Sequence, residues 1–262
     1  MNAIESVYRS GFEWARLGLK VITTGYAQLV LNPGDPEHHE GNAAWYVSIE
    51  DKEMGYLQDI ETVYAEHGLT CHHVVPHYSS DKTVKFLKMQ NYLDSPAYGF
   101  MIEPYFASLP ASYEFIPAES ELDLYEKVYS LPGQRFAFPE IRSTLERLVA
   151  QNSLRLFSCR YNGQLVGRVG ALRVSDGTLR LKSIFVSSAH RKRGVATVML
   201  QHVSNIAKIE GASRLSSEVE ISNVSSVKLH RKFGFEDVGF VHCFTRDAQQ
   251  GNPAGAFGAA AF

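Results

Sequence analysis

The stretch from Ile184 to Ala196 reads Ile-Phe-Val-Ser-Ser-Ala-His-Arg-Lys-Arg-Gly-Val-Ala and decides the fold. Its apolar start is typical of a buried strand, and the residues after Gly194 repeat apolar side chains at helical spacing, which predicts a helix. The first amides of a helix have no partner inside the helix, so they attract anions, and a glycine lets a ligand approach the backbone. The basic turn between strand and helix therefore predicts a pyrophosphate site.

The composition limits the class of protein. The chain has 262 residues, with 26 basic and 28 acidic side chains and a net charge of -2. We therefore expect no general binding to nucleic acid or to an anionic membrane. Three widely spaced cysteines favour a reducing compartment over a disulfide framework or a zinc site. With no signal peptide and no apolar span of membrane length at its start, the protein is expected to be soluble and cytoplasmic.

The predicted elements form two successive series of strands and helices. The first series has a helix at 3–19, strands at 20–24 and 27–31 closed by a turn at 32–36, a strand at 43–49, a helix at 56–67, a strand at 70–75, a helix at 80–89 and a strand at 98–102. The second has a strand at 113–116, helices at 119–130 and 139–150, strands at 154–160, 164–174 and 179–186, the helix after Gly194, a strand at 214–219, a helix at 223–232 and a strand at 238–245. The Pro-containing connection 103–110 predicts a first domain at 1–105 and a second at 106–247, followed by a flexible tail at 248–262.

The two series resemble each other. The run Val84-Lys85-Phe86-Leu87-Lys88 aligns with Val227-Lys228-Leu229-His230-Arg231, and Gly68 aligns with Gly211 at the same offset, which indicates a tandem repeat. Chance similarity between two amphipathic helices is the alternative. In this register Ser48, Asp51 and Glu53 stand in place of Arg191, Gly194 and Ala196. Because carboxylates there would repel a pyrophosphate, we predict that the N-terminal half has no cofactor site.

Two ordered motifs in the second half resemble those of the GCN5-related N-acetyltransferase (GNAT) family. Val186-x-x-x-x-Arg191-x-x-Gly194-x-Ala196 is similar to the family's acyl-CoA signature, although Ser188 stands where many members have proline. Glu218-Val219-x-x-x-Asn223-x-x-Ser226-x-x-x-His230-x-x-x-Gly234-Phe235 is similar to its second motif. The resemblance covers residues 154–245 directly. It implies an α/β fold of tandem GNAT-like domains, each with a mixed, mostly antiparallel sheet flanked by helices.

The resemblance also implies how acetyl-CoA would bind. The backbone of Ile184, Phe185 and Val186 would flank its pantetheine. The pyrophosphate would lie on the turn and the first helical residues, which are Arg191, Lys192, Arg193, Gly194, Val195, Ala196 and Thr197. Asn223 and Ser226 would form the cofactor side of the next helix. No metal is implied.

Two side chains are candidates for proton transfer. The resemblance places Glu218 where a glutamate often acts as the base that deprotonates an amine, directly or through water, and a packing role is the alternative. His230 stands where many members have a tyrosine that protonates the leaving thiolate. Imidazole can donate a proton near neutral pH, but a structural histidine is the alternative here too.

The implied function is transfer of an acetyl group from acetyl-CoA to a primary amine of a small molecule or peptide. A CoA-binding sensor without catalysis, or an enzyme that uses a longer acyl-CoA, are the alternatives. The runs Glu37-His38-His39-Glu40 and Cys71-His72-His73, and the lone Cys243, are set aside as primary sites, because adjacent residues point in different directions and no base is visible beside the thiol. The acceptor is not identified, and the sequence leaves open a monomer or a homodimer.

Overall fold

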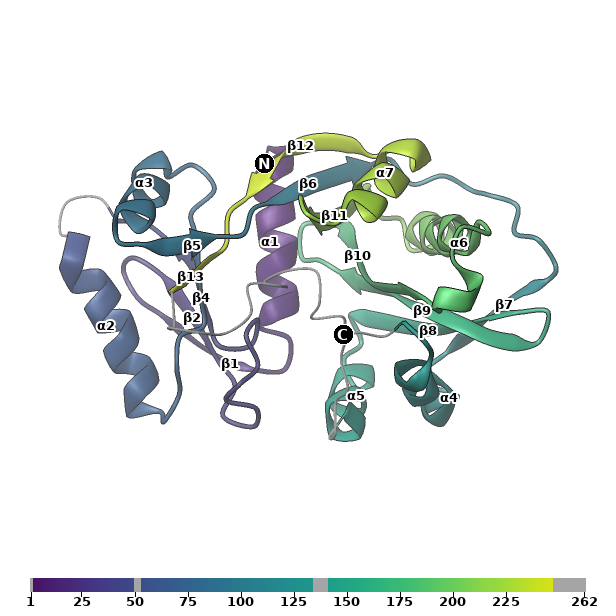
Figure 1. The fold of residues 1–262 in the computed structure, drawn as a ribbon, viewed down its shortest axis with the longest axis horizontal. Helices are drawn as coiled ribbons and strands as arrows, with labels where there is room; N and C mark the ends of the chain where they lie inside the picture. Colours follow the sequence, from purple (N-terminus) through teal and green to yellow (C-terminus); the bar gives the residue numbers. More distant parts are fainter. Residues whose placement is uncertain (1, 50–52, 134–140, 247–262) are drawn as a thin grey trace. The chain divides into compact units, whose positions relative to one another are not determined.

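The computed structural model describes residues 2–49, 53–133 and 141–246 (Figure 1). Its contacts divide the chain into two compact units. The first takes the described parts of Met1–Gly99, Glu218–Asn223 and Val238–Ala260, and the second takes those of Phe100–Ser217 and Val224–Asp237. Each unit thus draws on both sides of the expected boundary after residue 105, and that boundary stays a prediction. The expected tail at 248–262 lies outside the described residues.

The first sheet has the strand order β1-β2-β3-β4-β13-β5. Its strands are β1 (Lys20–Thr23), β2 (Gln28–Leu31), β3 (Ala43–Val47), β4 (His73–Pro76), β13 (Phe244–Arg246) and β5 (Tyr92–Asp94). β3 and β4 pair in parallel, and the other neighbours pair antiparallel. This is the mixed, mostly antiparallel sheet that the resemblance implies.

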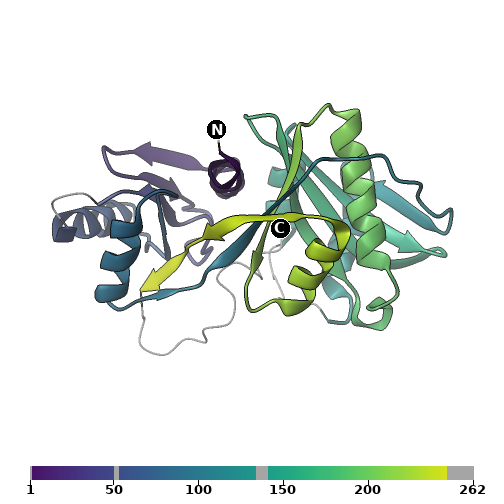
Figure 2. The same cartoon turned by 90° about the horizontal axis from the view of Figure 1, so that it is seen from above.

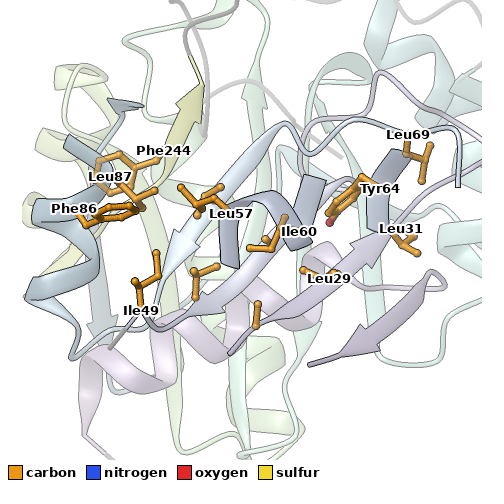
Figure 3. Close-up of a cluster of buried hydrophobic side chains, with 14 residues drawn as sticks. Leu29, Leu31, Ile49, Leu57, Ile60, Tyr64, Leu69, Phe86, Leu87 and Phe244 are labelled. Atoms are coloured by element: carbon orange, nitrogen blue, oxygen red, sulfur yellow. The ribbon is translucent and has the colours of Figure 1, made fainter. Parts of the chain in front are cut away.

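Helices α2 (Glu53–Glu66) and α3 (Asp81–Met89) pack on this sheet because each buries an apolar face (Figure 3). Their shared core joins Leu57, Ile60 and Tyr64 from α2, Phe86 and Leu87 from α3, and strand residues such as Leu29, Leu31 and Phe244. Helix α1 (Ala3–Ala15) packs on β3, where the ring of Phe12 lies 5.4 Å from that of Tyr46. Its first turn is capped by the Asn2 side chain, which accepts the Glu5 amide at 2.8 Å.

The second sheet has the order β12-β6-β11-β10-β9-β8-β7. Its strands are β12 (Glu236–Val241), β6 (Ala97–Ile102), β11 (Arg214–Glu220), β10 (Thr178–Val186), β9 (Gln164–Arg173), β8 (Leu154–Tyr161) and β7 (Tyr113–Pro117). β7 to β10 form an antiparallel meander, and β10 and β11 are parallel. Asn162 and Gly163 both have positive φ, 48° and 78°, as the predicted hairpin turn between β8 and β9 requires.

Helices cover both faces of the second sheet. A methyl group on Gly167 of β9 would lie 2.8 Å from Cε of Met199, in helix α6 (Val195–Ile209). The next residue, Arg168, places its guanidinium 3.9 Å over the ring of Tyr129, in the short helix η1 (Val128–Ser130) that follows α4 (Leu122–Lys127). Because consecutive strand residues point to opposite faces, α6 lies on one face and η1 on the other. Figure 2 shows α6 running along its face of the sheet.

Each sheet includes one strand from the other half of the chain. β6, from the N-terminal half, lies between β11 and β12, and β13, from the end of the chain, lies between β4 and β5. The order β1, β2, β3, α2, β4, α3, β5, β6 matches the order β8, β9, β10, α6, β11, α7 (Val224–Phe233), β12, β13. Apart from β7, which has no counterpart in the first sheet, the two strand orders therefore agree, and this supports the tandem repeat.

Most of the predicted elements are present, with two differences. The hairpin between β1 and β2 turns at Thr24–Ala27, where the Thr24 amide donates to the Ala27 carbonyl, and the predicted turn at 32–36 follows β2, with the Asp35 amide donating to the Asn32 carbonyl. The short strand β5 was missed. The strand predicted at 238–245 is two strands, β12 and β13, in different sheets. Helix α5 (Ile141–Val149) matches the described part of the helix predicted at 139–150.

Among the described residues, no helix combines the length and the apolar character that crossing a membrane requires.

Candidate functional site

The central feature of the second unit is the separation of β10 from β11. Their parallel pairing runs from Thr178↔Arg214 to Arg180↔Ser216, yet β10 continues to Val186. On its other edge β10 stays paired with β9 up to Val186↔Gly167. After Arg180, β10 is therefore paired with β9 on one edge, while the described pairing with β11 on its other edge has ended. A strand edge of this kind can bind an extended chain that carries amides.

A bulge shapes the part of β10 that follows Arg180. The register with β9 shifts between Lys182 and Phe185, and Ser183 has a φ of 59°, which a residue other than glycine rarely adopts. Gly167 makes the bulge possible, because a methyl group there would lie 2.0 Å from the carbonyl oxygen of Phe185. The sequence predicted the strand residues Ile184, Phe185 and Val186 correctly, but it contained no signal for the bulge.

A helix N-terminus follows directly. Gly194 is the N-cap of α6, with φ 82° and ψ -3°, and no side chain caps the helix there. The first turn holds no acidic residue, and the first helical bond described is from the Val198 amide to the Gly194 carbonyl, at 3.1 Å. The amides of Val195, Ala196 and Thr197 therefore lie at the positive end of the helix dipole, an arrangement that attracts phosphate.

The three basic residues of the turn have different roles. Nε of Arg191 donates to the carbonyl of Val186 and Nη2 donates to that of Gly133, both at 3.1 Å. These bonds tie the turn to the end of β10, and the expected contact of Arg191 with the pyrophosphate stays a prediction. Arg191, Lys192 and Arg193 are all exposed, so each can supply charge to an anion.

His230 of α7 is buried. Its Nδ1 lies 2.8 Å from the carbonyl oxygen of Ser226 and its Nε2 lies 3.0 Å from Oγ of Ser217. Burial lowers the pKa of His230 to about 4, although the bond to Ser226 acts in the opposite direction. The ring also stacks on Phe100, with centroids 5.3 Å apart. A neutral imidazole bonded at both nitrogens favours the structural alternative, and its role as general acid stays a prediction.

Glu218 belongs to the first unit, two residues beyond the last β10–β11 pair. Its carboxylate lies against α1, with Oε1 2.7 Å from the position that a methyl group on Gly11 would take. Asn223 is exposed just before α7, and its amide donates to the Glu220 carbonyl at 3.0 Å. Ser226 is half-buried in the first turn of α7. The structure thus gathers Ile184–Thr197, Ser226 and His230 in the second unit, while Glu218 and Asn223 belong to the first.

Comparison with known proteins agrees with this geometry. A profile described as "Acetyltransferase (GNAT) family" matches residues 120–235. This part of the chain belongs to the GNAT family. Proteins of that family use acetyl-CoA.

The individual relatives are distant. N-acetyltransferase 8 of Homo sapiens is 35% identical over 81 residues, which are 29% of this chain and 36% of that protein. An aminoglycoside N(6')-acetyltransferase type 1 of Acinetobacter haemolyticus is 24% identical over 129 residues, 49% of this chain and 83% of that one. The structure of a GCN5-related N-acetyltransferase from Kribbella flavida covers 97% of this chain and 96% of its own, with 15% identity and a TM-score of 0.66. That last similarity shows that the fold extends over both halves.

The N-terminal half lacks the geometry of the GNAT site in its described residues. Its corresponding parallel pair, β3 and β4, stays paired to Val47↔Pro76 despite a register shift after Ala44. The amide of Ile49 is bound by Oγ1 of Thr83, at 3.0 Å. Residues 50–52, which include Asp51, lie outside the description. The absence of a cofactor site from this half stays a prediction.

The histidine and cysteine residues that the sequence analysis set aside contact one another in the structure. Nδ1 of His73 lies 2.8 Å from Sγ of Cys243, and Nε2 of His73 lies 3.2 Å from Nδ1 of His39. Burial lowers the pKa of His73 to about 3 and raises that of Cys243. Among the described residues, no group of three or more such side chains has the arrangement of a metal site.

The sequence analysis did not identify the buried side chain that lies beside Phe185, which is Arg168. Arg168 is fully buried, and its guanidinium lies 3.9 Å from the ring of Tyr129 and 5.2 Å from that of Phe185. Phe185 and Arg168 are direct cross-strand partners, so both side chains lie on the η1 face. A charged residue within an apolar strand was the available signal. The guanidinium of Arg168 therefore packs beside the ring of Phe185 at the bulge.

Proposed function

We propose that the protein is an N-acetyltransferase that moves the acetyl group of acetyl-CoA to a primary amine. The observation that carries the proposal is that the described pairing of β10 with β11 ends at Arg180 while β10 continues to Val186, where the N-terminus of α6 follows without a side-chain cap at Gly194. Only the turn from Ser187 to Gly194 separates β10 from α6, so one extended ligand that carries amides and a pyrophosphate would suit both features. Pantetheine has amides for the strand edge, and pyrophosphate has charge for the helix amides.

The chain's own residues would act as follows. The backbone of Ile184 to Val186 binds pantetheine, and the amides of Val195 to Thr197, with Lys192 and Arg193, bind the pyrophosphate. When bound, acetyl-CoA supplies an acyl carbon that is open to attack by an amine. Glu218 takes the proton that the attacking amine must lose, directly or through water. The amide product keeps the acetyl group, and the CoA sulfur takes up a proton as it leaves.

Protonation of the sulfur is the least defined step. His230, which the sequence places there, is neutral and already binds Ser217 and Ser226. Water can protonate a thiolate of moderate pKa, so turnover does not require this imidazole. This observation also favours the second candidate, a CoA-binding sensor that does not turn over.

The proposed function is tested first by ligand binding and then by turnover. CoA and acetyl-CoA should raise the melting temperature, by an amount equivalent to about 2.7 kcal/mol at 100 times the dissociation constant. Release of free thiol from acetyl-CoA should then depend on an added amine. The panel should hold amino acids, polyamines, peptide N-termini and aminoglycosides, the last because one relative carries that name. Binding without amine-dependent release would support the sensor, and absence of binding at millimolar CoA would refute both.

A further inference from the structure

Gly11 is an exception within its helix. It lies in the middle of α1 and is buried, although glycine inside a helix is less stable than alanine by roughly 0.5–1 kcal/mol. A methyl group there would lie 2.7 Å from Oε1 of Glu218 and 3.0 Å from Cη2 of Trp45. The space left by the missing side chain is therefore filled by the carboxylate and the edge of the indole.

The charge of Glu218 acts on other groups of the first unit. Burial raises the pKa of Tyr8, and the negative charge of Glu218 adds to that rise. Tyr8 lies three residues before Gly11, on the same side of α1. Burial likewise raises the pKa of Tyr46 in β3 and of Cys243 before β13, and Glu218 contributes to both. The charge of this carboxylate therefore acts on titratable groups of α1, of β3 and of the chain before β13.

We infer that α1 is a positioning element for the catalytic carboxylate, with Gly11 as its positioning residue. The inference rests on the proposed function of Glu218 as base. A base must be held within hydrogen-bond reach of the proton that it takes, and a misplacement of about 1 Å can cost on the order of 100-fold in rate. The helix backbone at Gly11 and the ring of Trp45 restrict where the carboxylate can lie. Helix α1 then determines where the carboxylate of Glu218 lies within the first unit.

The decisive variant is Gly11→Ala. Alanine favours the helix, and the closest contact is with the end of a flexible side chain, but the buried ring of Trp45 must also give way by a few tenths of an ångström, so the two effects should offset and the melting temperature should change little. The carboxylate must move, so kcat should fall by roughly 10- to 100-fold. The KM for acetyl-CoA should not change, because β10 and the turn before α6 are untouched. Gly55→Ala is the matched control, since Gly55 is an exposed helical glycine of α2 with open space around it.

A double-mutant cycle tests whether Gly11 affects turnover through Glu218. If Gly11 acts through Glu218, Gly11→Ala should cost nothing further in a Glu218→Gln background. The inference is overturned if Gly11→Ala leaves kcat at the wild-type value, or if its loss is the same with and without the carboxylate. It is also overturned if Gly55→Ala lowers kcat as much, because helix stiffening alone would then explain the result.

A second readout needs no acceptor. The chain has two tryptophans, so a nitrogen-15 spectrum shows two indole signals. The Trp45 signal should move in Gly11→Ala, because the added methyl group displaces the carboxylate and presses on the edge of the indole. An unchanged Trp45 signal in Gly11→Ala refutes the positioning role. If the signal moves but Glu218→Gln keeps full turnover, α1 positions the carboxylate and the assignment of Glu218 as base fails instead.

Discussion

Nε2 of His230 lies 3.0 Å from Oγ of Ser217, and this contact fixes what the histidine can do. The carbonyl of Ser226, 2.8 Å from Nδ1, can only accept, so Nδ1 carries the proton. Nε2 is then the acceptor of the Ser217 hydroxyl and has no proton to give. A histidine at this position thus links α7 to β11, where the GNAT motif would place a proton donor.

The variant His230→Phe should therefore affect stability more than turnover. It leaves the Ser217 hydroxyl and the Ser226 carbonyl buried without this partner, which should lower the free energy of unfolding by about 1–3 kcal/mol. Urea denaturation measures that loss. Ser217→Ala is the control, because it removes one of the two bonds and keeps the imidazole. A loss of turnover of roughly 100-fold or more with unchanged stability would instead identify His230 as the general acid.

Stability should fall in mild acid because His230 and His202 are buried in the neutral form. Burial lowers the pKa of each from 6.5 to about 4. Between these values the unfolded chain binds protons that the folded chain does not, so stability is complete above pH 6.5 and is lost as the pH falls towards 4. One such histidine contributes roughly 3 kcal/mol over the full window. Melting temperatures from pH 7.5 to 4.5 measure the effect, and His202→Phe, which keeps the aromatic contact with Phe115, should weaken the pH dependence. A flat profile would contradict this prediction.

The helix N-terminus at Gly194 should be sensitive to a carboxylate. In Gly194→Asp the new side chain can itself cap the free amides of α6, and its charge repels phosphate. CoA affinity should fall by roughly 100-fold or more, measured by calorimetry, while the fold persists. Gly163→Asp is the matched control, because Gly163 also has a positive φ, 78° against 82°, with open space around it, but lies in the β8–β9 turn. Equal loss of affinity in both variants would show that backbone strain, and not the site, is responsible.

What the sequence could predict depends on the range of the interactions. The strand, turn and helix around Gly194 follow from local periodicity and from a glycine at positive φ, and they were predicted correctly. The hydrogen bonds of His230 and the contact between Gly11 and Glu218 join residues far apart in the chain, so no local pattern contains them. The only signal for Gly11 in the sequence was a glycine within a helical pattern. Such a glycine indicates a close packing contact but does not identify the residue on the other side of it.

The exchange of strands was missed for the same reason. Residues 238–245 are mostly apolar, and such a run predicts one strand, but the chain leaves the ladder at His242 and Cys243. His242 faces Asp94, with Nδ1 and Oδ2 2.9 Å apart, and Cys243 faces His73. These contacts with β4 and β5 direct β13 into the first sheet, and only the tertiary structure shows them.

The exchange predicts that neither half folds alone when the chain is divided after residue 105. The fragment 106–262 would lack β6, so β11 and β12 would lose the strand between them. The fragment 1–105 would lack β13, together with Phe244 of its core. Open strand edges and a missing core side chain favour aggregation over folding. Each fragment expressed alone should therefore show no cooperative melting, whereas the two expressed together should form a soluble pair that melts cooperatively. A fragment 106–262 that melts cooperatively by itself would show that β6 is dispensable for the second sheet.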